Sequence, residues 1–112
     1  MIINEISFHD STILKVTEKS KTQALDFKLY FPVDWDNNIF EKKVLIFENV
    51  TFYSLEEIPF GNLRTILNII DLGETKKDLS TYGNSWVIVR KKIKIETNAG
   101  SRIIEFSDCG FV

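Results

Sequence analysis

The segment K-K-V-L-I-F-E-N-V-T-F-Y, from Lys42 to Tyr53, decides how the fold is organised. Its Val44–Phe47 portion is apolar on consecutive residues, whereas a strand with one solvated face would alternate apolar and polar residues. The run is short, rich in β-branched and aromatic residues, and free of glycine and proline, which favours a strand over a helix. It therefore predicts a central strand buried on both faces, with a bulge or an exit from the sheet at Glu48-Asn49.

Further strands are predicted on both sides of this segment. The clearest alternation lies in residues 23–31, where four apolar residues at every second position face one way and polar residues face the other. Pro32 is expected to end that strand, because proline cannot donate a ladder hydrogen bond. The other expected strands are 2–8, 13–19, 86–97 and 103–106, with a hairpin turn at 98–101.

A single helix is predicted from Asn62 to Gly73. Leu63, Ile66, Leu67 and Ile70 follow the spacing of one apolar helix face. Asn62 suits an N-cap, and Gly73 suits a C-terminal stop. The β-branched residues in this stretch would also suit a strand, and that alternative stays open.

These patterns together predict an α+β fold. We expect one domain spanning residues 1–112, with a predominantly antiparallel sheet of about six strands in hairpins and one helix covering it. The expected core comprises Phe8, Leu14, Val16, Leu25, Phe27, Leu29, Val44, Ile46, Phe47, Ile66, Ile70, Val87, Val89, Ile95, Ile104 and Phe106.

Composition argues against several classes of function. The chain has 14 basic and 16 acidic residues, so its net charge is −2, and the only basic cluster is residues 90–94. Nucleic acid is therefore not an expected partner, because phosphate binding needs a concentrated positive field. No apolar stretch is long enough to span a membrane, and the start of the chain lacks the pattern of a signal peptide. With Cys109 as the single cysteine, these features predict a cytoplasmic protein that is a monomer or a homodimer.

His9, Asp10, Ser11 and Cys109 are the residues that could carry catalysis. Three consecutive residues in an extended chain point in alternating directions, so His9-Asp10-Ser11 does not fit a catalytic triad and is better explained as a turn. Cys109 could act as a nucleophile only if His9 lay beside it. We expect no enzyme, no cofactor and no metal site; the alternative is a small ligand-binding or hydrolytic module around His9, Asp10 and Cys109.

The segment 34–57 is the strongest candidate for a binding surface. It carries six acidic residues against two lysines and also holds Trp35 and other aromatic residues. Aromatic anchors supply much of the energy at protein interfaces, and charge steers the encounter. We therefore expect a protein partner to contact Asp34, Trp35, Asp36, Glu56 and Glu57.

Four stretches carry a family resemblance: F-H-D-S-T-I-L-K-V at 8–16, the Trp35 loop, V-L-I-F-E-N-V at 44–50, and I-E-F-S-D-C-G-F at 104–111. Their order along the chain resembles small bacterial immunity proteins of polymorphic-toxin systems. The resemblance implies a cytoplasmic, non-enzymatic protein that binds a cognate toxin domain and blocks it. An acidic face would suit a basic toxin domain. The resemblance carries no catalytic motif.

Overall fold

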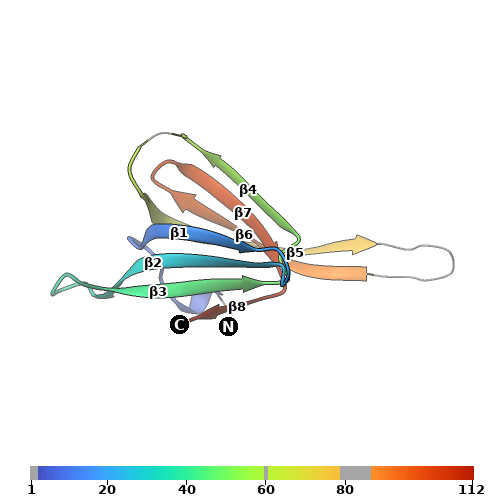
Figure 1. The fold of residues 1–112 in the computed structure, drawn as a ribbon, viewed down its shortest axis with the longest axis horizontal. Helices are drawn as coiled ribbons and strands as arrows, with labels where there is room; N and C mark the ends of the chain where they lie inside the picture. Colours follow the sequence, from blue (N-terminus) through green and yellow to red (C-terminus); the bar gives the residue numbers. More distant parts are fainter. Residues whose placement is uncertain (1–2, 60, 79–86) are drawn as a thin grey trace.

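The computed structural model describes residues 3–59, 61–78 and 87–112, and the described chain is almost entirely β-structure (Figure 1). Every ladder between its strands is antiparallel. The described elements are η1 (Ile3–Glu5), β1 (Thr12–Lys19), β2 (Ala24–Asp34), β3 (Ile39–Glu48), β4 (Phe52–Glu57), β5 (Arg64–Asp78), β6 (Val87–Thr97), β7 (Gly100–Phe106) and β8 (Asp108–Phe111).

The strands form one continuous sheet in the order β4-β7-β6-β5-β1-β2-β3-β8. The junction at its centre is narrow, because β1 pairs with β5 only through Thr12 with Thr65 and Ile13 with Arg64. The sheet therefore divides into a β2 half, made of β1, β2, β3 and β8, and a β6 half, made of β4, β5, β6 and β7. In Figure 1 the two halves lie one over the other as two layers.

The core lies between these two halves. Phe27 and Phe47 of the β2 half meet edge to face, with their ring centroids 5.5 Å apart. Phe47 meets Phe106 of the β6 half in the same way at 4.9 Å. All three rings are almost completely buried. The buried hydrophobic residues are Ile3, Phe8, Ile13, Leu25, Phe27, Leu29, Leu45, Phe47, Ile66, Ile93, Ile95, Ile104, Phe106 and Cys109.

The chain crosses between the halves at two neighbouring corners. One follows Glu48, where Asn49 adopts a left-handed backbone with φ 51°, and β4 then begins in the other half. The second is Ser107, between β7 and β8, whose backbone N–H donates to the Glu48 carbonyl over 3.0 Å. The predicted break at Glu48-Asn49 is therefore the end of β3, where the chain crosses to the other half of the same sheet, and not a bulge within one strand.

The predicted helix over Asn62–Gly73 is wrong, and with it the α+β class. In the described residues no helix reaches seven residues, and this stretch runs mainly in β5. Its β-branched residues satisfy the strand alternative, with Ile66 fully buried and Leu67 exposed. Gly73 is not the end of a helix. It lies within β5 with φ 89°, where the pairing register with β6 shifts between Asp71 and Glu74.

Two strand boundaries and part of the quoted segment also differ from the sequence prediction. Residues 3–5 form η1 rather than a strand. β2 continues past Pro32 to Asp34, with a register shift against β3 after Pro32. The predicted central strand buried on both faces is wrong: Leu45 and Phe47 are fully buried but Val44 and Ile46 are only partly buried, and β3 lies next to the end of the strand order.

The predicted core is confirmed at Phe8, Leu25, Phe27, Leu29, Phe47, Ile66, Ile95, Ile104 and Phe106. Leu14, Val16, Val44, Ile46 and Ile70 are only partly buried. Val87 and Val89 are exposed, at 58% and 43%, because they lie where β5 and β6 extend together beyond the two layers (Figure 1). Trp86, where a strand was expected to start, lies outside the described residues.

Candidate functional site

Trp35 lies in the turn of the β2–β3 hairpin, which projects from the body of the protein (Figure 1). The indole is 57% exposed. It stacks on the His9 ring, with centroids 6.0 Å apart and an interplanar angle of 15°. A large aromatic side chain is thus presented to solvent and held from one side.

The turn that carries Trp35 is braced by Asp34. The Asp34 carboxylate accepts hydrogen bonds from the Asn37 backbone N–H at 3.2 Å and from the Asn37 side-chain amide at 2.7 Å. These bonds from Asn37, the side-chain one first, hold the pKa of Asp34 below its ordinary value. Asp34 therefore stays negatively charged beside the indole at neutral pH, and Asp36 on the other side of Trp35 is exposed.

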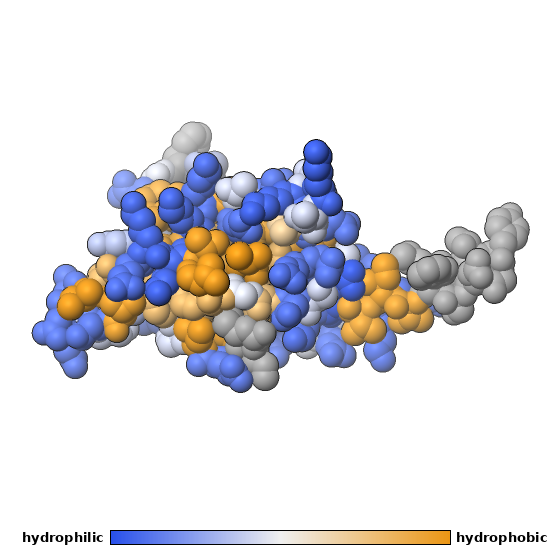
Figure 2. Space-filling view, turned by 60° about the horizontal axis from the view of Figure 1, so that its bottom comes forward, coloured by the Kyte–Doolittle hydropathy of each residue, from blue (hydrophilic) through white to orange (hydrophobic). Residues whose placement is uncertain are grey.

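Apolar side chains also lie along the hairpin, on both of its faces, since Ile39 and Phe40 are consecutive on β3. Val33 and Ile39 are 43% and 49% exposed. Tyr30 and Phe40 stack with ring centroids 5.1 Å apart. Figure 2 shows hydrophobic surface at the end of the molecule opposite the extended part of β5 and β6. We call Tyr30, Val33, Asp34, Trp35, Asp36, Ile39 and Phe40 the hairpin surface.

Glu56 and Glu57 are not part of the hairpin surface, although the sequence grouped them with Trp35. They end β4, in the opposite half of the sheet. Glu56 is exposed. The Glu57 side chain is only 6% exposed, so it points into the protein rather than toward a partner.

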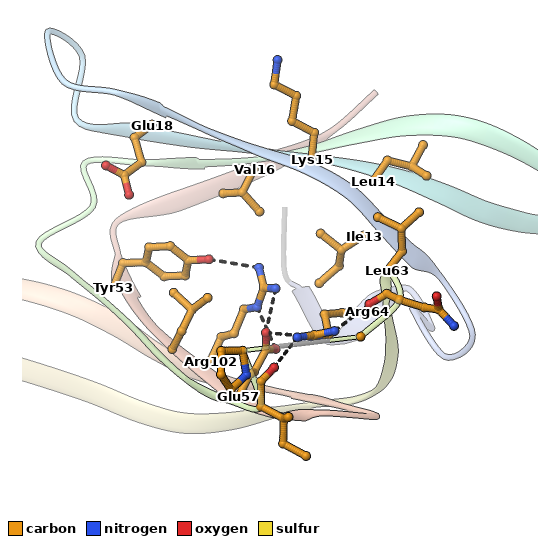
Figure 3. Close-up of a pocket in the computed structure, with 15 residues that line it drawn as sticks. Ile13, Leu14, Lys15, Val16, Glu18, Tyr53, Glu57, Leu63, Arg64 and Arg102 are labelled. Carbon is orange, nitrogen blue, oxygen red and sulfur yellow. Dashed lines mark hydrogen bonds and ion pairs between the residues drawn. The ribbon is translucent and has the colours of Figure 1, made fainter.

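Glu57 lies at one end of a cleft of about 670 Å³ between β1 and β4 (Figure 3). One wall is the β1 segment Ile13–Val16 together with Glu18. The other wall comes from β4 and the residues that follow it. Leu55, Ile58 and Leu63 on that side are 50%, 63% and 56% exposed, so the cleft is rimmed by apolar side chains.

A polar cluster occupies the floor of the cleft. The Arg102 guanidinium donates to both carboxylate oxygens of Glu57, through Nε and Nη2 at 2.9 Å each, and its Nη1 donates to the Tyr53 hydroxyl at 3.1 Å. Arg64 Nε lies 3.4 Å from Glu57 Oε1, and the Thr97 hydroxyl donates to Oε2 at 2.9 Å. Figure 3 shows Tyr53 and Glu57 of β4, Arg64 of β5 and Arg102 of β7 converging there.

Electrostatics in the cluster favour its charged form. Burial acts to raise the pKa of Glu57, but the hydrogen bonds from Arg102 and Thr97 and the charges of Arg102 and Arg64 outweigh it and leave that pKa below its ordinary value. Burial also raises the pKa of the Tyr53 hydroxyl. One glutamate is therefore shared by two arginines, and the three side chains together carry a net positive charge.

Gly100 allows the β6–β7 turn to approach the end of β4 and so fixes Glu57 near Arg102. A Cβ atom at Gly100 would lie 2.0 Å from the Glu56 carbonyl oxygen, and its φ of 148° is one that side chains rarely adopt. The Ile58 N–H donates to the Ala99 carbonyl at 3.0 Å across the same contact.

Cys109 lies in different surroundings from His9 and Asp10. His9 Nδ1 lies 2.7 Å from the Leu67 carbonyl, which can only accept, so this nitrogen carries the hydrogen. Its Nε2 lies 3.5 Å from Asp10 Oδ1. Cys109 is buried beside Phe47 of β3, and burial raises the pKa of its thiol. A small hollow that His9 lines, between residues 4–9 and 67–69, does not include Cys109.

The cleft was not predicted from the sequence, although the spacing of two charged residues relative to core residues indicates it. Arg102 lies two residues before Ile104 and four before Phe106, in phase with the inward-facing side of β7. Glu57 is likewise in phase with Tyr53 on β4. Charged residues in phase with core residues on two strands indicate a buried ion pair.

Within residues 3–59, 61–78 and 87–112 there is no helix long and apolar enough to cross a membrane, and no group of three or more His, Cys, Asp or Glu side chains that could hold a metal ion. Comparison of the chain with protein-family models, with curated proteins and with solved structures found no match.

Proposed function

We propose that this chain is a non-enzymatic binding protein whose hairpin surface docks onto a protein partner. The observation that carries the proposal is Trp35, a 57% exposed indole at the turn of a projecting hairpin, flanked by two aspartates. A solvated Trp contributes nothing to a core, whereas a Trp buried in a partner's pocket is among the strongest anchors of protein interfaces.

The hairpin surface is suited to binding because it is already ordered. The Trp35 indole is held against His9, and the Asp34 bonds to Asn37 fix the turn. Side chains that are fixed before binding lose less conformational entropy when a partner docks. Exposed apolar side chains lie close to the anchor along the hairpin, with Ile39 on one face and the stacked Tyr30–Phe40 pair on the other.

The charge of this surface favours a basic partner. Asp34, Asp36 and Glu41 lie on the hairpin, with Lys42 and Lys43 further along β3. In its most specific form the proposal is a cytoplasmic immunity protein that neutralises a basic toxin domain. The resemblance of four stretches of the chain to immunity proteins supports this form, and the acidic turn fits it.

Trp35→Ala tests the proposal. The wild-type chain and the variant are used side by side as baits in lysate of the native cell, and the partner retained by the wild type is purified for calorimetry. We expect the variant to lose about 2 kcal/mol or more of binding free energy, which is about a 30-fold rise in Kd. Urea unfolding of the two chains should nearly coincide, because the indole is largely solvated.

Val87→Ala is the matched control, since Val87 is 58% exposed but lies on β6, away from the hairpin. It should bind like the wild type. Equal affinities of wild type and Trp35→Ala for the partner would overturn the hairpin surface as the binding site. A partner that does not inhibit cell growth, or whose toxicity this chain does not relieve on co-expression, would overturn the immunity form.

A further inference from the structure

A second surface, distinct from the hairpin, follows from the cleft. We infer that the cleft between β1 and β4 binds an extended polypeptide segment, which adds to the free edge of β4 as a further strand. The inference goes beyond the proposed function and does not depend on it, because the cleft and the hairpin surface share none of their lining residues.

The first step is the unpaired edge. β4 ends the strand order, and it pairs only with β7 among the described strands, over Phe52–Glu57. Its other side presents backbone N–H and C=O groups toward the cleft. Across the cleft, β1 pairs with β5 only at Thr12 and Ile13, so its remaining residues also lack a strand on that side in the described part of the chain. Unpaired edges of this kind are templates for strand addition.

The second step is space along the whole edge. A smaller hollow of about 340 Å³ continues from the cleft. Its lining includes Glu18 and Lys19 of β1 on one side and Thr51–Tyr53 on the other. Glu18 and Tyr53 line both hollows, so the opening follows β4 from its start to its end. An extended segment, rather than a compact ligand, matches this shape.

The third step is an interior that the side chains of residues 3–59, 61–78 and 87–112 leave partly open. Leu55 pairs in register with Arg102, whose side chain is only 9% exposed, so both face inward. Leu55 is nevertheless 50% exposed, because the cleft opens beside it. Val16, on the opposite wall, pairs with the fully buried Phe27 and is itself only partly buried. An apolar side chain of the added strand would cover Leu55 and Val16 and complete the core.

The fourth step is charge at one end. Arg102 and Arg64 share the single carboxylate of Glu57. The bonds described above involve Nε, Nη1 and Nη2 of Arg102 and leave the two positive charges of Arg102 and Arg64 balanced by one carboxylate. A carboxylate on the added segment near this end of β4 would meet a net positive charge. The occupant is therefore an extended segment with an apolar residue and an acidic residue.

The test uses random twelve-residue peptides displayed on phage and selected against the immobilised full chain, with depletion on the uncoated support. The best peptide is synthesised and its Kd measured by fluorescence anisotropy. We expect Leu55→Lys to raise Kd at least tenfold. Leu72→Lys, the same change at a Leu 44% exposed on β5, should leave Kd unchanged.

Strand addition predicts two further results. Methylating the peptide nitrogens singly should weaken binding at alternate residues, because every second N–H of an added edge strand points at β4. Peptide should also slow hydrogen exchange of the backbone amides in Phe52–Glu57. The selected peptides should carry Asp or Glu at one position, and Arg64→Gln should weaken binding of those peptides.

Several results would overturn the inference. One is a selection that yields no peptide above the background of the uncoated support. Another is a peptide that tolerates methylation at every nitrogen or leaves exchange in β4 unchanged. Wild-type chains that dimerise in sedimentation, with Leu55→Lys monomeric, would assign the cleft to a second copy instead. Trp35→Ala should leave peptide binding intact, so failure of this inference and failure of the hairpin proposal are separable.

Discussion

The two ends of the interior between the sheet halves are filled in different ways. At the corner near Asn49 and Ser107, the rings of Phe27, Phe47 and Phe106 meet edge to face and exclude water. Along β1 and β4, Arg102 and its partners occupy the interior and leave a cleft open. The two regions meet at Phe27, since the Arg102 guanidinium carbon lies 6.0 Å from the centroid of that ring.

This difference shows that facing inward and being buried are separate properties. Leu45 pairs with Phe27, and Leu55 pairs with Arg102, so each faces the interior. Leu45 is fully buried and Leu55 is half exposed. The aromatic corner should therefore contribute more to stability than the apolar rim of the cleft, where the extended segment is proposed to bind, and substitutions on each side can test that difference.

Phe47→Ala should have the largest effect. It removes a fully buried ring that contacts both Phe27 and Phe106 and leaves a cavity between the halves. Phe-to-Ala changes in cores cost about 3–5 kcal/mol, and we expect a value near 4 kcal/mol in urea unfolding. A cost below about 2 kcal/mol would mean that the corner does not carry the stability assigned to it.

Glu57→Gln should cost less, about 3 kcal/mol. The side chains of Glu57 and Arg102 are only 6% and 9% exposed, so the variant leaves a buried guanidinium without its counter-charge. The same urea measurement checks it, with Glu56→Gln as the matched control on the exposed neighbour. The control should change stability by less than about 0.5 kcal/mol. Similar losses from both changes would contradict the buried network.

The pH dependence of stability sharpens this comparison. The pKa of Glu57 in the folded chain lies below the ordinary 4.5, so its stabilisation is fully present above that pH and is lost as pH falls through the folded value. The unfolding free energies of wild type and Glu57→Gln should therefore converge as pH drops from 5 toward 3. A gap that stays constant down to pH 3 would show that Glu57 is not the titrating group.

Much of the sheet could be predicted because its alternation is local. The alternation in residues 23–31 predicted β2, and the break at Glu48-Asn49 indicated where β3 ends and the chain crosses to the other half of the sheet. The Asn62–Gly73 stretch could not be assigned from spacing alone, because Leu63, Ile66 and Ile70 satisfy a helical period by coincidence. The stretch forms a strand because it is rich in β-branched residues and because it pairs with β6, which lies far away in the sequence.

The candidate sites divide in the same way. Trp35 and Asp36 are exposed, and Asp34 is partly exposed beside them, because the three are adjacent in the chain at one turn, a local property. Glu56 and Glu57 share the acidic character of that segment but lie in the other half of the sheet, because the chain crosses over at Asn49. The cleft requires β1, β4 and β7 to meet, which depends on the whole topology.

The smallest expected effect is that of Leu55→Ala, which is compared with Leu45→Ala at another leucine that faces inward. Leu45→Ala should cost about 3 kcal/mol, because it empties a fully buried site. Leu55→Ala should cost about 1 kcal/mol or less, because water already reaches half of that side chain and no closed cavity forms. Both are measured by urea unfolding without any ligand. Equal costs would mean that the β1–β4 side closes in solution, and the cleft would then have no opening in which to admit a strand.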